Sequence, residues 1–145
     1  MQILVMTQLE AEEGPPPAVP YAHISILGPG WRTALPDVPH RLATLFLECD
    51  DIRDEDAGGT PISEEQAREV VLFVTNLPEA VEVLVCQCRA GCSRSPATAA
   101  AVARILGMDE APFFDNPNYA PNPLVYHKIL MAALIERGGG TRSRR

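Results

Sequence analysis

Residues 82–107 hold an apolar run, a short loop with a glycine and an alanine-rich segment, in that order. The apolar run at residues 83–85 predicts a buried strand. Ser95 and Pro96 predict the N-cap and first turn of a helix, which Gly107 is expected to end. A strand, a tight loop and a helix N-terminus in this order form an anion site. The loop N–H groups point inward, and the helix dipole adds partial positive charge.

Cys88 and Arg94 flank this loop and make the anion site a candidate reaction centre. A loop that curls over a tetrahedral oxyanion puts the Cys88 sulfur beneath it and the planar Arg94 guanidinium on its oxygens. The loop N–H groups, the helix dipole and Arg94 all favour the thiolate, which is the nucleophilic form of a cysteine. The hydroxyl of the next residue, Ser95, can stabilise the sulfur when a covalent intermediate breaks down.

The segment Cys88-Arg-Ala-Gly-Cys-Ser-Arg94-Ser95 resembles the signature loop of the cysteine-dependent protein tyrosine and dual-specificity phosphatases. That motif is Cys, two residues, Gly, two residues, Arg and then Ser or Thr, and every fixed position matches. The resemblance implies a phosphomonoester hydrolase that works through a Cys88 thiophosphate, with Arg94 and Ser95 as further catalytic residues. It also implies that the loop binds the phosphate, through Arg89, Ala90, Gly91, Cys92, Ser93 and Arg94.

Two more positions relate the chain to this family. Gln87 stands where the family usually has a His, which orients the loop and tunes the thiol. Short bacterial and phage-type members carry an Ala-Pro-Asn segment before their final helix, as residues 120–122 do here. We expect Asn122 to cap that helix, with bracing of the phosphate loop as the alternative.

An acidic cluster, residues 48–56, follows an apolar run that predicts a strand. Cleavage of a phosphate ester needs a general acid to protonate the departing oxygen. The residues alone leave Asp50, Asp51 and Asp54 as candidates. In the phosphatases this acid is an Asp at or just past the end of a strand upstream of the Cys. The resemblance therefore favours Asp51, whose Asp-Ile context is most like the family's.

Apolar runs predict four strands, at residues 3–6, 22–27, 43–47 and 83–85. The acidic, proline-rich residues 9–20 predict a connector with little chance of regular structure near its proline run. A capping box at Ser63 predicts a helix, and further helices are expected after the Cys88 loop and from Asn122. This order predicts an α/β fold with a mostly parallel sheet of about four to five strands flanked by helices. Ligands of such sheets bind beyond the carboxyl ends of the strands, where the Cys88 loop and the acidic cluster lie.

Bulk properties narrow the function classes. The 145 residues suit one domain, expected over residues 1–137 and followed by a flexible basic tail over 138–145. The net charge of −7 argues against nucleic acid and anionic membrane surfaces as partners, and no apolar run reaches membrane-spanning length. The expected partner is a phosphorylated protein or a small phosphomonoester. A thiolate nucleophile favours the reducing cytoplasm.

Two other functions use a similar cradle. A pseudophosphatase would keep it as a non-catalytic module that binds phosphate or phosphoproteins. A rhodanese-like sulfurtransferase would use the cysteine for sulfur transfer. Cys88, Arg94 and Ser95, together with the acidic cluster, favour the phosphatase. No cofactor and no metal is expected, because Arg94 repels a cation from the cysteine cluster.

The remaining candidate residues have simpler explanations. On oxidation, Cys88 can form a reversible disulfide with Cys86, Cys92 or Cys49, although Cys86 is also explained as packed core. His23 lies within a predicted strand, where a hydrogen-bonded structural role is expected.

Overall fold

The structure, a computed structural model, describes residues 1–143. At its centre is one four-stranded parallel sheet in the order β1-β4-β2-β3. The strands are β1 (Gln2–Met6), β2 (Tyr21–Leu27), β3 (Arg41–Glu48) and β4 (Val83–Gln87). The predicted α/β class and parallel sheet are confirmed, and each predicted strand lies within an observed one.

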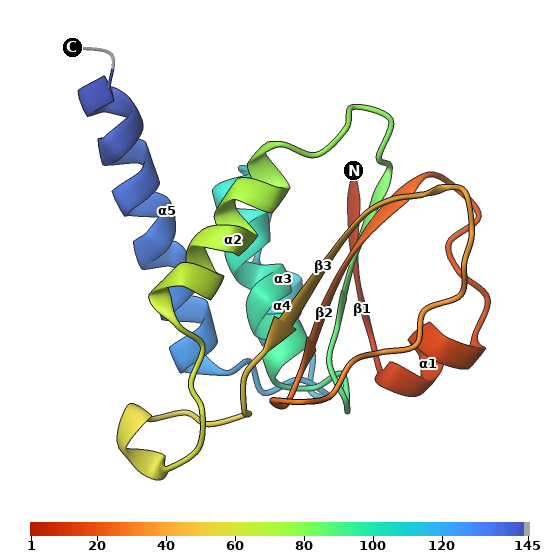
Figure 1. The fold of residues 1–145 in the computed structure, drawn as a ribbon, viewed down its shortest axis with the longest axis horizontal. Helices are drawn as coiled ribbons and strands as arrows, with labels where there is room; N and C mark the ends of the chain where they lie inside the picture. The colour runs from red at the N-terminus through yellow and green to blue at the C-terminus, as the bar shows by residue number, and fades with distance from the viewer. Residues whose placement is uncertain (144–145) are drawn as a thin grey trace.

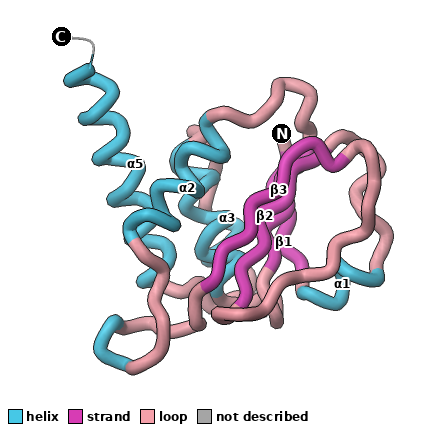
Figure 2. Tube along the Cα trace, in the orientation of Figure 1, coloured by secondary structure: helices cyan, strands magenta, loops and turns pink. Residues whose placement is uncertain are grey.

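Helices cover the sheet mainly on one side, as Figure 1 shows. These are α2 (Glu64–Thr75), α3 (Arg94–Ile105), α4 (Ala111–Asp115) and α5 (Pro123–Ser143). The short helix α1 (Gln8–Glu13) and the long connectors lie on the other side (Figure 2). A 3-10 turn, η1 (Glu55–Ala57), follows β3. Within residues 1–143, no helix combines the length and the apolar character needed to cross a membrane.

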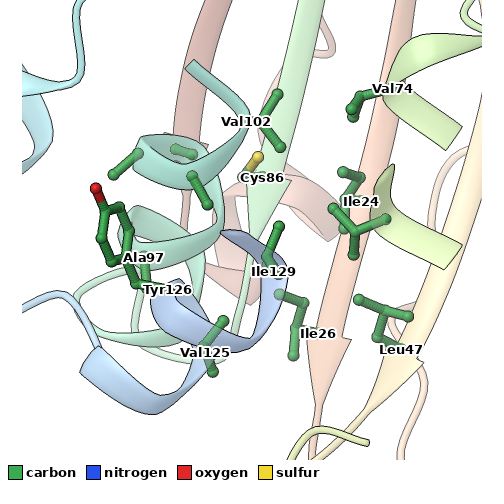
Figure 3. Close-up of a cluster of buried hydrophobic side chains, with 14 of the residues drawn as sticks. Ile24, Ile26, Leu47, Val74, Cys86, Ala97, Val102, Val125, Tyr126 and Ile129 are labelled. Atoms are coloured by element: carbon green, nitrogen blue, oxygen red, sulfur yellow. The ribbon is translucent and has the colours of Figure 1, made fainter. Parts of the chain in front are cut away.

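The main core fills the space between the sheet and helices α2, α3 and α5 (Figure 3). Ile24 and Ile26 of β2 and Cys86 of β4 contribute to it. The first ten residues of α3 are all buried, which accounts for its many alanines. Short side chains let a buried helix pack closely against both the sheet and α5. Cys86 is therefore packed core, the simpler of its two sequence-based explanations.

The opposite face of the sheet carries a second, smaller cluster. It consists of Tyr21, Val83 and Val85, with Val19 and Val38 of the connectors packed against it. Side chains alternate along a strand, so the same face also holds the buried polar residues His23, Ser25 and Gln87. This face therefore has a polar region near the carboxyl ends of β2 and β4.

Helix α1 occupies the first part of the predicted connector, where the sequence analysis named no helix. Thr7 Oγ1 accepts a hydrogen bond from the Glu10 N–H at 3.0 Å, and Glu10 Oε1 accepts one from the Thr7 N–H at 2.9 Å. This reciprocal capping box starts a helix that ends before the proline run. The Thr-x-x-Glu spacing is visible in the sequence, but the nearby prolines and acidic residues obscured it.

The predicted N-cap of α3 is wrong by two residues. Ser93 occupies that position and α3 begins at Arg94, so Ser95 lies in the first turn. The predicted end is close to the observed one. Gly107 follows the helix with φ +73°, in the left-handed region that glycine adopts readily.

Helix α5 begins as predicted, with Asn122 as its N-cap. Asn122 Oδ1 accepts hydrogen bonds from the N–H groups of Leu124 at 3.0 Å and Val125 at 3.2 Å. The helix continues to Ser143, past the boundary expected at residue 137. Residues 144 and 145 of the expected tail lie outside the described residues.

Candidate active site

The Cys88 loop, residues 88–93, connects β4 to α3 at the carboxyl edge of the sheet. Gly91 has φ +66°, and a Cβ at this position would lie only 3.1 Å from backbone atoms of Met6. Glycine is needed here for both the turn and the close approach. The end of β1 therefore packs directly against the loop and helps to set its shape.

Hydrogen bonds from outside the loop hold three of its carbonyl groups. Arg89 O accepts from the Gln8 N–H at 3.1 Å, Cys92 O from Ala120 at 2.8 Å and Ser93 O from Asn122 at 3.1 Å. The C=O and N–H of a trans peptide point in opposite directions, so these bonds turn the neighbouring N–H groups toward the centre of the loop. Among the described residues, no protein acceptor pairs with the N–H groups of residues 89–94. Such a ring of donors can bind an anion.

Gln87 holds the first carbonyl of the loop. Its Nε2 donates to Cys88 O at 3.2 Å, and its Oε1 lies 3.0 Å from His23 Nε2. Burial, the largest effect, lowers the pKa of His23 to about 4, so the imidazole is neutral at pH 7. Since an amide oxygen only accepts, Nε2 of His23 carries the proton. The pair fixes the Gln87 amide at the position where the phosphatases usually have a His.

Cys88 lies at the base of the loop, 2% exposed, with its Sγ 3.1 Å from the Ser95 hydroxyl. Burial raises the pKa of the Cys49 thiol to about 11, and burial also raises that of Cys86. Both thiols are therefore protonated at neutral pH, and neither is a candidate nucleophile. All four cysteines are free. Within residues 1–143, no group of three or more His, Cys, Asp and Glu side chains is arranged to hold a metal ion.

Arg94 is the buried cation of the site. Its Nη1 donates to Cys49 O at 2.7 Å, which ties the guanidinium to the end of β3. Its Nε is buried and has no hydrogen-bond partner among the described residues. No described carboxylate lies within ion-pair distance of it. A buried, unpaired guanidinium is costly, and an oxyanion held by Nε and the remaining N–H groups would offset that cost.

Asp51 is attached to the Cys88 loop and to α5. Its Oδ1 accepts hydrogen bonds from Ser93 Oγ at 2.7 Å and from Asn122 Nδ2 at 2.8 Å. Asn122 Nδ2 also donates to Ile52 O at 2.9 Å. Asn122 thus combines both roles considered for it, because it caps α5 and its N–H holds Ser93 O of the loop, and it also holds the acidic segment.

The other two acid candidates differ from Asp51 in position. Asp50 lines the same pocket, and its Oδ2 accepts a hydrogen bond from the Thr60 N–H at 2.7 Å. Asp54 accepts a hydrogen bond from the Asp56 N–H at 2.9 Å and caps η1, away from the pocket lining. The geometry therefore brings Asp50 and Asp51, but not Asp54, to the site.

A pocket of about 450 Å³ shares Asp51 and Arg94 with this site, although Cys88 is not part of its lining. The lining comes from the end of β2 and from the segments that follow the four strands: Gln8, Leu27, Gly28, Pro29, Trp31, Asp50, Asp51, Arg89 and Arg94. Two arginines and two aspartates face one space, as expected from parallel strands whose carboxyl ends meet at one edge. The sequence analysis did not identify Gln8 as a site residue. The only sequence signal was the capping box at Thr7, which starts the helix that carries Gln8.

No protein-family model matches the chain, and no curated protein matches it. Solved structures do match over nearly its full length. The human tyrosine phosphatase-like serine/threonine/tyrosine-interacting protein has 20% identity and a TM-score of 0.61, with 93% of each chain covered. Human DUSP28 has 16% identity and a TM-score of 0.60, with 94% of each chain covered. PTPMT1 in complex with PI(5)P has 11% identity and a TM-score of 0.61, covering 96% of this chain and 94% of that one.

The resemblance of the Cys88 segment and the structural match of the whole fold indicate the same group of proteins. The three-dimensional match covers 93–94% of the chain and therefore extends well beyond the signature loop. The chain therefore has the fold of the cysteine-dependent tyrosine and dual-specificity phosphatases.

Proposed function

We propose that this protein is a cysteine-dependent phosphatase that hydrolyses phosphomonoesters, of the tyrosine or dual-specificity type. One observation carries the proposal. The Cys88 sulfur lies beside the Ser95 hydroxyl, and the unpaired guanidinium of Arg94 lines the adjoining pocket. A nucleophile near a guanidinium that makes no ion pair suits an anionic electrophile.

The reaction has two steps. The Cys88 thiolate attacks phosphorus and the P–O bond to the leaving group breaks, while Asp51 gives its proton to the departing oxygen. Water then attacks the thiophosphate, Asp51 takes a proton from it, and the P–S bond breaks to release phosphate. Arg94 and the loop N–H groups hold the equatorial oxygens in both steps. Ser95 donates a hydrogen bond to the thiolate as it leaves.

The substrate is a phosphorylated protein or a small phosphomonoester, and the site of action is the reducing cytoplasm. PTPMT1, which has this fold, binds the phosphorylated lipid PI(5)P. A phosphate-bearing ligand is thus compatible with the fold. The positive charge of Arg94 and the free N–H groups would recognise the phosphate of any such ligand.

A pseudophosphatase that only binds phosphorylated partners is the second candidate. One matching structure is described as a tyrosine phosphatase-like interacting protein, and Gln87 replaces the usual His of the phosphatases. The cradle of Arg94 and loop N–H groups serves binding as well as turnover. The two candidates differ in whether Cys88 reacts.

The test is release of p-nitrophenol from p-nitrophenyl phosphate, in the presence of reductant and chelator. We expect turnover by the wild type and by Cys92→Ser, a control in the same loop, and no turnover by Cys88→Ser. Equal turnover by Cys88→Ser would overturn the cysteine mechanism. No turnover by any form, with a thermal shift on adding vanadate, would favour the pseudophosphatase. Sulfur transfer from thiosulfate to cyanide, measured in parallel, tests the rhodanese-like alternative.

The general acid is tested by Asp50→Asn, Asp51→Asn and Asp54→Asn. General acid catalysis typically contributes about 10²- to 10⁴-fold, most with a poor leaving group. We expect Asp51→Asn to lower kcat by about this factor with phosphoserine, and by less with p-nitrophenyl phosphate. Asp54→Asn is the control and should retain activity. A larger loss in Asp50→Asn than in Asp51→Asn would move the role to Asp50.

A further inference from the structure

Trp31 is the single tryptophan of the chain and lies at the mouth of the candidate active site. Its side chain is 72% exposed, although tryptophan is among the residues that gain most from burial. Leu27 and Pro29 line the same pocket and extend its apolar wall. An exposed indole in the pocket that Arg94 also lines is a contact surface available to a substrate.

The turn after β2 holds Trp31 in this position. The Trp31 N–H donates to Gly28 O at 3.1 Å, and the intervening Gly30 has φ +85°. The Gly30 N–H donates to Glu48 Oε1 at 2.6 Å, which ties the turn to the end of β3. The indole is close to this turn, since a Cβ built on Gly28 would lie 3.9 Å from Trp31 Cδ1. A fixed backbone lowers the entropic cost of binding against the indole.

Other aromatic side chains do not offer this surface. Tyr21 of β2 is buried in the smaller hydrophobic cluster, on the face of the sheet opposite the main core. Phe113 packs against the main core, and Phe114 stacks edge-on against Tyr126 of α5. None of these lines the pocket. Trp31 is the aromatic residue that can contact a substrate whose phosphate is bound by Arg94.

The charges of the pocket restrict the substrate further. Arg94 binds the scissile phosphate, and Arg89, Asp50 and Asp51 share the lining with Trp31. Beyond Arg94, this lining holds one guanidinium and two carboxyl groups, so it has no excess of positive charge to attract a further anionic group of the substrate. An uncharged aromatic ring can instead lie against the indole, in the offset or edge-to-face geometry that aromatic pairs prefer.

We infer that Trp31 is a specificity-determining residue that selects phosphomonoesters of an aromatic ring, such as phosphotyrosine, over aliphatic ones. This inference rests on the proposed phosphatase function of the same pocket. Trp31 contacts the ring of the leaving group and takes no part in bond cleavage. Its replacement changes which substrate is preferred and leaves the chemistry at Cys88 intact.

The kinetic test compares kcat/KM for free phosphotyrosine and phosphoserine in the wild type, Trp31→Ala and Trp31→Phe. The intrinsic difference between aryl and alkyl leaving groups cancels, because each variant is compared with the wild type on the same substrate. We expect Trp31→Ala to lower kcat/KM for phosphotyrosine about tenfold, near the upper range for an aromatic contact, and to leave phosphoserine within about twofold. Trp31→Phe should restore most of the loss. Phe114→Ala, an exposed aromatic outside the pocket, is the matched control.

A binding test does not depend on turnover. Trp31 is the only tryptophan, so its fluorescence in Cys88→Ser reports directly on the mouth of the pocket. Phosphotyrosine should change its emission, whereas inorganic phosphate should raise the melting temperature without doing so. If phosphate binds or is turned over but Trp31→Ala affects both amino-acid substrates equally, the inference fails and the proposed function stands. If neither phosphate binding nor turnover is found, both fail.

Discussion

The hydroxyl of Ser95 lies at hydrogen-bond distance from the candidate nucleophile, 3.1 Å from Cys88 Sγ. A hydrogen bond to a charged group contributes about 1.5–3 kcal/mol. This bond is needed most when the thiophosphate breaks down and the thiolate leaves. We predict that Ser95→Ala lowers kcat about 10- to 100-fold and makes the second step rate-limiting. Rapid-mixing kinetics with p-nitrophenyl phosphate should then show a burst of p-nitrophenol close to the enzyme concentration.

Ser25→Ala is the matched control for this change. Ser25 is also buried, but its hydroxyl pairs with Thr33 Oγ1 at 2.9 Å on the other face of the sheet. The control should lose some stability and show no burst. An unchanged kcat in Ser95→Ala would mean that Cys88 leaves without help from this hydroxyl.

His23 links the stability of the protein to pH. Burial lowers its pKa from 6.5 to about 4, so between these values the unfolded chain takes up a proton that the folded protein does not. The free energy of unfolding therefore falls as the pH falls from 6.5 to 4, by up to about 3 kcal/mol, and is unaffected above this range. We predict that His23→Gln makes urea midpoints between pH 4.5 and 7 less dependent on pH.

The exposed His127 provides the control for His23. His127→Gln should keep the wild-type dependence of unfolding on pH, because its side chain lies outside the core. Equal slopes for the wild type and His23→Gln would show that the imidazole does not stay neutral in the fold. Activity should fall in His23→Gln as well if His23 orients Gln87 and, through it, the first carbonyl of the Cys88 loop.

Among the elements, Asn122 at the start of α5 joins three parts of the site. Its Oδ1 caps the helix, and its Nδ2 donates to Asp51. Its backbone N–H donates to Ser93 O of the Cys88 loop. Asn122→Ser keeps a capping oxygen but removes the donor that reaches Asp51. We predict that this variant lowers kcat/KM about tenfold with a loss of stability under about 1 kcal/mol. Asn122→Ala should show the same kinetic loss and lose about a further 1 kcal/mol from the missing cap.

Both variants are measured by chemical denaturation and by turnover of p-nitrophenyl phosphate. The kinetic loss is expected to depend on Asp51, so it should be absent when Asn122→Ser is made in an Asp51→Asn background. Additive losses in the double variant would mean that Asn122 acts on the site by some other route, such as the position of the Cys88 loop.

The strands and the start of α5 were predictable because their signals are local. Apolar runs mark the four strands, and an Asn-Pro pair marks the N-terminus of α5. The start of α3 was not, since Ser93 and Ser95 are equally good N-caps in sequence. Neither side chain caps the helix backbone, because the Ser93 hydroxyl donates to Asp51 and the Ser95 hydroxyl pairs with Cys88, so tertiary contacts rather than capping engage both serines. Local patterns carry no record of such a contact.

At the scale of the whole molecule, the parallel sheet explains why one pocket gathers residues from distant parts of the chain. Gln8 follows β1, Trp31 lies in the loop after β2, Asp50 follows β3 and Arg89 follows β4. Sequence alone predicted that the Cys88 loop and the acidic cluster share this edge, since the rule needs only strands and their order. It could not show which side chains turn inward. That depends on loop conformations such as the turn at Gly28 and Gly30.

Arg94 couples this pocket to the stability of the whole fold. Its guanidinium is buried without an ion pair, which destabilises the protein until an anion binds. We predict that Arg94→Met is at least as stable as the wild type in phosphate-free buffer, even though Cys49 O loses a hydrogen bond. A ligand at about 100 times its Kd stabilises the wild type by about 2.7 kcal/mol, or about 5–10 °C in melting temperature at this chain length. Phosphate or vanadate should have no such effect on Arg94→Met.

Arg68→Met is the control for this prediction, because Arg68 is exposed and already paired with Glu136. It should keep the full thermal response to phosphate. Removal of Arg94 deletes the charge that an oxyanion would neutralise, so stability without ligand and stabilisation by ligand should change in opposite directions. Differential scanning fluorimetry across a phosphate titration measures both at once. A marked loss of stability in Arg94→Met without ligand would instead assign the guanidinium to the fold, through its bond to the end of β3, rather than to the binding of phosphate.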